Sequence, residues 1–119
     1  MEGVLLDPAQ LARVAVDAAA DKKASDITLL DVHELTPIAD YFVICSANNP
    51  RQIQAIADAI DEALSKQGAR VLHREGDAET GWLLLDFGDI IVHIFGQKER
   101  EYYQLERLWN QAKMVVYLQ

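Results

Sequence analysis

The chain has 119 residues, half of them hydrophobic and a quarter charged, which suits one globular domain, 1–119, with a single core. Nineteen acidic and eleven basic residues give a net charge of −8, and no segment is rich in Lys or Arg. Since binding to RNA or DNA usually begins with a basic patch, this balance predicts little or no direct nucleic-acid binding and favours a basic protein partner.

The N-terminal segment and the cysteine content predict a cytoplasmic protein. The start of the chain lacks the basic residues and long apolar run of a signal peptide, and Glu2 and Asp7 argue against a transit peptide. No apolar run approaches the ~20 residues that cross a membrane, so no membrane association is expected. Cys45 is the single cysteine, which excludes a disulfide within the chain.

The first predicted element is a helix that begins at Asp7-Pro8-Ala9-Gln10. These residues supply an N-cap, a proline at the first helical position and a glutamine three residues after the cap. The helix should end near Lys22 or Lys23, because cations suit a helix C-terminus. The residues of its apolar stripe, which can lie on a sheet, are Leu11, Val14, Ala15, Ala18 and Ala19.

Two strands are predicted next. Residues 27–32 are β-branched or leucine-rich, with Asp26 before them. After a turn around Thr36-Pro37, residues 41–45 are apolar at every position, which predicts a central strand covered on both faces.

A second helix is predicted to begin at Asn49-Pro50-Arg51-Gln52, which repeats the pattern of cap, proline and glutamine. It should end before Gly68, which is placed to be its C′ residue. Its apolar stripe consists of Ile53, Ile56, Ala57, Ile60 and Leu64. Residues 70–73 then predict a short third strand, and the polar residues 74–81 predict a loop.

The second half of the chain predicts a hairpin and a helical segment. Residues 82–87 and 90–95 are apolar strands separated by Gly88-Asp89, a pair typical of a tight turn. From Gln97 onward, apolar residues at helical intervals predict a short helix or a helix pair, and the apolar tail 114–118 could add a strand or pack on a neighbour. The expected fold class is therefore α/β, with helices packed on a mixed five-stranded sheet.

Candidate catalytic and metal-binding residues are few and scattered. Cys45 lies inside the most apolar strand, where a buried thiol is expected rather than a nucleophile. His33, His73 and His93 have no partner at metal-ligand spacing. Residues 46–50 join a strand to a helix, as phosphate loops do, but contain no glycine. We therefore expect no enzyme activity, no metal and no cofactor.

The roles of three polar residues in the hairpin can each be interpreted in two ways. His93 interrupts an apolar strand, so it is either a hydrogen-bonded core or edge histidine or a contact to a partner. Asp86 and Asp89 flank the predicted turn at a spacing that does not suit a Mg²⁺ site. They either stabilise the strand end and the turn or pair with cations on a partner.

Four stretches together resemble the Iojap/ribosomal silencing factor (RsfS-like) family. They are Ala39-Asp40-Tyr41-Phe42-Val43-Ile44-Cys45-Ser46, Arg51-Gln52 followed by Ile56-Ala57-Asp58, the hairpin from Trp82 to Phe95, and Tyr103, Leu105, Glu106, Leu108 and Trp109. Their order and spacing also match, and the resemblance runs from about Leu11 to Trp109. Residues 110–119 extend past the usual end of the family as a C-terminal extension.

The resemblance implies a nucleotidyltransferase-like fold without the catalytic motif, and a translational repressor. Members of the family bind the large ribosomal subunit through its ribosomal protein uL14 and block association with the small subunit. The resemblance also suggests a homodimer when free and a monomer on the ribosome. The partner-binding residues that it implies are Glu75 in the predicted loop, Trp82, Asp86, Gly88, Asp89, His93, Arg100, Tyr103 and Trp109.

Within this set, Trp82 is the expected anchor, because a large aromatic side chain among polar groups is a common hot spot. Trp109 has the helical spacing of a core residue and could pack inside instead.

Two other functions are kept as alternatives. One is a divergent nucleotidyltransferase-type enzyme that uses Asp86 or Asp89 with Mg²⁺, which nucleotide binding would reveal. The other is a self-associating scaffold built on the apolar tail, for which the evidence would be an oligomer that ignores ribosomes.

Overall fold

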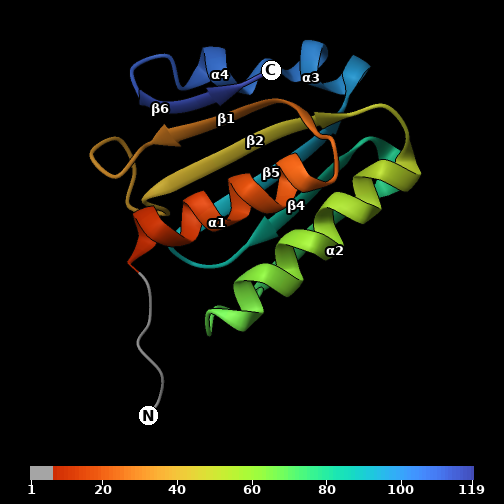
Figure 1. Ribbon diagram of the computed structural model, residues 1–119. Coiled ribbons are helices and arrows are strands. Elements are labelled where there is room, and N and C mark those ends of the chain that lie inside the picture. The colour runs from red at the N-terminus through yellow and green to blue at the C-terminus, as the bar shows by residue number, and fades with distance from the viewer. Residues whose placement is uncertain (1–6) are drawn as a thin grey trace.

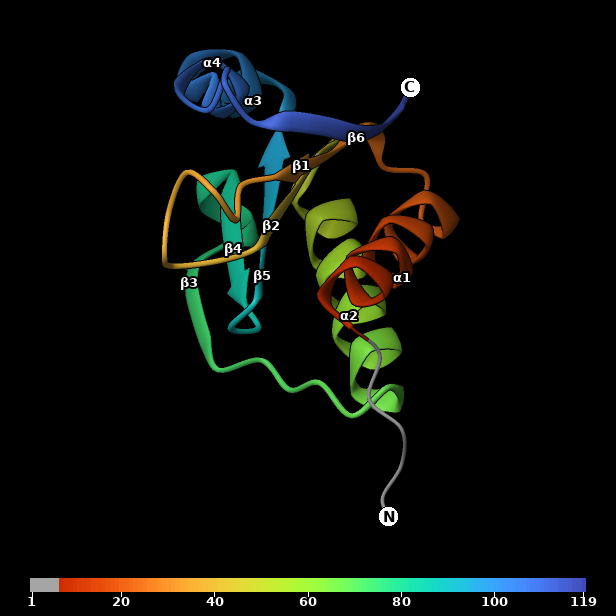
Figure 2. The same cartoon turned by 90° about the vertical axis from the view of Figure 1, so that its left-hand side faces the viewer.

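The chain forms a mixed sheet with helices on both faces (Figure 1; Figure 2). The computed structural model describes residues 7–119. Glu2 and the other residues before Asp7, whose character predicts the absence of a signal or transit peptide, lie outside the described residues. Helices α1 and α2 pack together on one face, and the short helices α3 and α4 lie over the other. The helix bounds are α1 Pro8–Asp21, α2 Pro50–Lys66, α3 Gln97–Tyr103 and α4 Leu105–Leu108.

The sheet has six strands in the order β3-β4-β5-β2-β1-β6. Strands β2 and β5 are parallel neighbours, and the four other pairings are antiparallel. The strand bounds are β1 Ser25–Asp31, β2 Tyr41–Ala47, β3 His73–Asp77, β4 Trp82–Asp86, β5 Ile90–Gly96 and β6 Lys113–Leu118. The predicted mixed α/β class is confirmed, but the predicted number of five strands is wrong.

The sixth strand, β6, is the apolar tail. It pairs with β1 at the edge of the sheet, from Lys113 opposite Asp31 to Leu118 opposite Ile27. Only its two middle residues are half-buried and the others are exposed. The strand therefore lacks the regular alternation of apolar and polar residues that identifies a strand with one buried face. For this reason the sequence alone did not decide whether the tail adds a strand or packs on a neighbour.

The third strand lies further along the chain than predicted. It was expected at 70–73, but β3 starts at His73 and occupies the first half of the predicted loop. Every residue of β3 is exposed, so the strand has no apolar pattern. Leu72, in the predicted range, is also exposed, at 71%, and its N–H donates to the Asp86 carbonyl at 2.7 Å just before β3 begins. A 3-10 turn, η1 (Ala78–Thr80), then leads into β4.

Alternation along the strands divides the interior into two cores. On β2, Val43 and Cys45 belong to the core under α1 and α2, whereas Phe42 and Ile44 belong to the core under α3 and α4, which is called the second core below. Both faces of β2 are therefore covered, and β1 and β5 flank it within the sheet. The prediction of a central strand is confirmed.

The long helices begin where the cap signals predict. The Asp7 carboxylate accepts a hydrogen bond from the backbone N–H of Gln10 at 2.8 Å, and the Gln10 side chain accepts one from the Asp7 N–H at 3.0 Å. Asn49 Oδ1 accepts from the Gln52 N–H at 2.8 Å. Gly68, predicted at the C′ position of α2, has φ of 85°, the left-handed conformation that glycine adopts without strain.

We expect Asn49→Ala to lower the free energy of unfolding by about 1 kcal/mol, because it removes the acceptor for one orphan N–H of α2. Urea denaturation of the two proteins measures this difference. Asn49→Asp keeps an acceptor at the cap and should retain nearly the original stability. An alanine variant as stable as the aspartate variant would contradict the cap assignment.

The predicted hairpin and helix pair are confirmed. Phe87 N–H donates to the Ile90 carbonyl at 2.9 Å, which encloses Gly88 and Asp89 in a two-residue turn. Gly88 has φ of 94° at the first central position, where a type II′ turn takes glycine. After β5, the chain continues into α3 and α4, with Gln104 at φ of 45° between them.

None of the helices in the described part of the chain is both long enough and apolar enough to cross a membrane.

Candidate functional site

The sheet face that carries α3 and α4 is only partly covered. In Figure 2 these helices lie over one end of the face, while β3 and the β1–β2 connection stand beside its remainder. Along β4, Trp82 and Leu84 point to this face because they share strand parity, and both remain half-buried at the edge of the second core. The aromatic and apolar surface around Trp82, Leu84 and Tyr103 is called the Trp82 surface below.

A pocket of about 260 Å³ opens at the Trp82 surface. The Tyr103 ring reaches down from the end of α3 and lies 4.5 Å, centroid to centroid, from the Trp82 ring. Backbone and side chains of β3 and η1 form the other wall. The residues that line the pocket are Glu75, Gly76, Thr80, Trp82, Leu84 and Tyr103.

His93, in the middle of β5, lies beside the Trp82 indole, with ring centroids 6.0 Å apart. The Trp82 indole Nε1–H donates to His93 Nδ1 at 3.2 Å, so the neutral imidazole carries its proton on Nε2. The His93 side chain is buried, and burial lowers its pKa to about 4. Of the two interpretations of His93, the hydrogen-bonded core histidine agrees with this geometry, and the histidine contributes to the surface by holding the indole.

Arg100 lies beneath α3 rather than on the outer surface. Its side chain is 11% exposed, and its guanidinium donates to the hydroxyl groups of Ser46 and Thr28 and to the carboxylate of Glu106. All of these partners belong to the chain itself. Arg100 therefore connects the helical segment to the sheet.

Trp109 follows α4 and packs edge to face on Phe42, with ring centroids 5.0 Å apart. It is half-buried against the second core. The prediction that Trp109 could be a core residue agrees with this packing. Its remaining exposed edge belongs to the same sheet face as the Trp82 surface.

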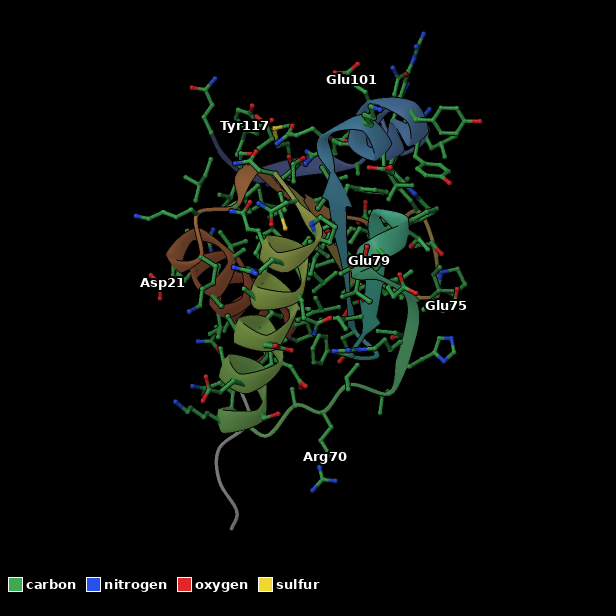
Figure 3. The ribbon with its side chains drawn as sticks, turned by 90° about the vertical axis from the view of Figure 1, so that its right-hand side faces the viewer. Asp21, Arg70, Glu75, Glu79, Glu101 and Tyr117 are labelled. Atoms are coloured by element: carbon green, nitrogen blue, oxygen red, sulfur yellow. The ribbon has the colours of Figure 1, made fainter. Side chains whose placement is uncertain are left out.

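Glu75 is also brought to the Trp82 surface, but from β3 and not from the predicted loop. Its carboxylate contacts His73 Nε2 at 2.7 Å, and the side chain stays largely exposed. Figure 3 shows Glu75 on the side of the molecule opposite to α1 and α2. It supplies an acidic group at the rim of the pocket.

Asp86, Gly88 and Asp89 lie at the far end of the β4–β5 hairpin, separated from Trp82 by the length of β4. Asp86 Oδ1 accepts the Gly88 N–H at 2.7 Å, and the Asp89 carbonyl accepts the Asp40 N–H at 2.8 Å. The two aspartates therefore stabilise the turn and its neighbour, and the Asp89 side chain is exposed. They are not part of the pocket.

Sequence reasoning missed three residues of the pocket. Leu84 could have been found, because it lies two residues after Trp82 and so on the same side of the strand. Gly76 and Thr80 carried no such signal, since their position depends on β3 and η1, which the sequence did not predict.

The residues considered as candidate nucleophiles or metal ligands do not come together in the described part of the chain. Cys45 is fully buried, and burial raises the pKa of its thiol to about 12. Within residues 7–119, no three His, Cys, Asp or Glu side chains come together as they would to hold a metal ion. A broad depression of about 1130 Å³ lies between the start of α2 and η1, away from the Trp82 surface, and Arg51, Asp58 and Glu79 are among its lining residues.

Comparison with known proteins gives a consistent result. Residues 6–118 match the family model described as "Ribosomal silencing factor during starvation" (RsfS). The chain is 43% identical over 102 residues to the ribosomal silencing factor RsfS of Bacillus subtilis, a match that covers 86% of each protein. It is 38% identical over 96 residues to the chloroplastic protein Iojap of Zea mays, covering 80% of this chain and 41% of that protein.

The fold is also shared with solved structures. A crystal structure of a Chromobacterium violaceum protein superposes with a TM-score of 0.84 at 29% identity, covering 93% of this chain and 94% of that one. A Bacillus halodurans protein gives a TM-score of 0.76 at 39% identity. The family match and the sequence identities together show that the chain belongs to the Iojap/RsfS family of ribosomal silencing factors.

Proposed function

We propose that this chain is a translational repressor without catalytic activity, which binds the large ribosomal subunit through uL14 and blocks the small subunit from joining. The observation that carries the proposal is the half-open Trp82 surface, in a chain whose family model and relatives bear the name of ribosomal silencing factors. The proposal includes a homodimer when the protein is free and a single copy on the ribosome.

The chemistry of the Trp82 surface suits a protein partner. Trp82 and Tyr103 provide apolar area that is already fixed by packing, and Glu75 stands at the rim. A central aromatic anchor with polar groups around it is the usual composition of a binding hot spot. The net charge of −8 favours a basic ribosomal protein and disfavours docking mainly on rRNA.

The proposed mechanism is steric exclusion. The domain measures 43 × 31 × 24 Å, so a bound copy would fill space that an approaching subunit needs. Repression would then depend on occupancy alone and would require neither turnover nor a cofactor. Asp86, Gly88 and Asp89 extend the proposed contact along the hairpin, where the exposed Asp89 carboxylate would pair with a cation on the partner.

Sedimentation of the purified protein with isolated large subunits, small subunits and joined ribosomes tests the proposal. We expect it to sediment with large subunits and to reduce the yield of joined ribosomes in a subunit-joining assay. Absence from every particle would overturn the proposal, as would binding that leaves joining unchanged. Cross-linking of the bound protein to uL14, and not to another protein, tests the finer assignment.

A further inference from the structure

Apolar contacts of the α3–α4 segment are confined to its C-terminal half, where Tyr103 packs on Trp82 and where Leu105 and the following Trp109 pack on the second core. No residue of α3 is buried, and Leu105 is the only buried residue of α4. Tyr102 and Leu108 are 80% and 75% exposed. Apolar burial normally fixes such short helices, because helices of one or two turns are not stable in isolation. The first turns of α3 therefore depend on an interaction other than apolar burial.

Arg100 supplies that interaction with a polar cluster at the base of α3. Its Nη1 donates to Ser46 Oγ at 2.8 Å and its Nη2 to Thr28 Oγ1 at 3.2 Å, while its Nε donates to Glu106 Oε2 at 2.8 Å. Thr28 and Ser46 are 1% and 0% exposed, and they come from β1 and β2. One guanidinium thus joins two strands to both α3 and α4, with the planar geometry that only arginine offers.

The position of Tyr103 depends on this cluster. Tyr103 lies one helical turn after Arg100, at the end of α3, and Gln104 then turns the chain into α4. Glu106, beyond that turn, binds the same guanidinium, so the segment is held on both sides of Tyr103. Tyr103 is 42% exposed and forms its wall of the pocket only while α3 stays in place.

We propose that Arg100 is a positioning residue, which pins α3 and α4 to the sheet and thereby fixes Tyr103 beside Trp82, so that the Trp82 surface is formed before a partner arrives. This inference rests on the proposed function, because it names the device that shapes the same surface. Arg100 acts from beneath the helices and does not itself contact the partner. A preformed surface binds more tightly than one that is formed only part of the time.

The buried hydroxyls permit a test in which nothing at the surface is changed. The double variant Thr28→Val, Ser46→Ala removes both hydroxyl acceptors while leaving every exposed side chain in place. It also leaves two guanidinium donors without partners, which favours release of the arginine into water. Ile60→Val is the matched control, since it removes one buried methylene from α2, in the core on the opposite face of the sheet.

Two readouts are compared in the wild type, the double variant, the control and Arg100→Ala. Hydrogen–deuterium exchange of the segment 97–109 should rise in the double variant and in Arg100→Ala but not in Ile60→Val. If only one molecule in ten then keeps the segment docked, binding to large subunits weakens about tenfold in both variants.

Unchanged exchange in 97–109 would overturn the proposal. A double variant that binds like the wild type while Arg100→Ala loses affinity would overturn it too, because Arg100 would then contact the partner directly.

The exchange readout needs no ribosome. If the wild type fails to bind large subunits, the proposed function is wrong, and exchange alone still decides whether the cluster holds α3 and α4 in place.

Discussion

Replacing Trp82 with alanine is expected to weaken binding to the large subunit by about 2 kcal/mol or more, roughly 30-fold in dissociation constant. The indole contributes a wall of the pocket and packs against Phe95 and Tyr103, with ring centroids 5.1 and 4.5 Å away. Its removal would eliminate the central apolar area of the Trp82 surface and loosen Tyr103. Quantitative sedimentation with isolated large subunits measures the change.

Two further variants separate this effect from general loss of structure. Trp82→Phe keeps an aromatic ring but loses the donor to His93, so its affinity should lie between those of the wild type and the alanine variant. Met114→Ala removes an apolar side chain that is 56% exposed on β6 and outside the pocket, and it should bind normally. A well-folded Trp82→Ala protein with unchanged affinity would remove Trp82 from the binding surface.

Acidification is expected to destabilise the protein through His93. Its pKa is about 4 in the folded chain, against an ordinary value of 6.5, because burial disfavours the charged imidazolium. Between these two values the unfolded chain binds a proton at this residue and the folded chain does not. The stability that His93 contributes is therefore present above about pH 6.5 and is lost as the pH falls to about 4, by on the order of 3 kcal/mol.

Urea denaturation at pH 7, 5.5 and 4.5 measures this dependence, with His93→Gln as the control. Glutamine can still accept from the Trp82 indole but does not titrate. All other side chains, including the exposed His33–Asp31 pair, are the same in both proteins, so the difference between the two pH profiles isolates His93. Parallel profiles for the wild type and the glutamine variant would show that His93 does not titrate as its burial requires.

The parts of the fold that the sequence predicts are those with a local physical signal. Asn49 and Gln52 identify the start of α2 because a cap needs only neighbouring residues. Gly88 identifies the hairpin because a two-residue turn requires a positive φ. Strand β2 is identified because both of its faces are buried, which leaves an uninterrupted apolar run.

The parts that the sequence does not predict depend on distant contacts. Strand β3 is exposed along its whole length, so its pairing with β4 leaves no apolar pattern. Arg100 has the character of a surface arginine in the sequence, and only the fold brings Thr28 and Ser46 beneath it. The candidate site divides in the same way: Trp82 could be chosen from its type and strand position, but its neighbours across the pocket could not.

The pairing of β6 with β1 has a consequence for the order in which the protein folds. Strand β1 comes early in the chain, whereas its outer neighbour β6 follows all the other strands in chain order and is therefore synthesised well after β1. Until then, the outer backbone of β1 has no partner, and unpaired strand edges promote association between nascent chains. Because this contact joins nearly opposite ends of the described chain, its closure should be a slow, late step in folding. A nascent chain stalled before residue 113 would retain α1, α2 and the inner strands but remain prone to aggregation.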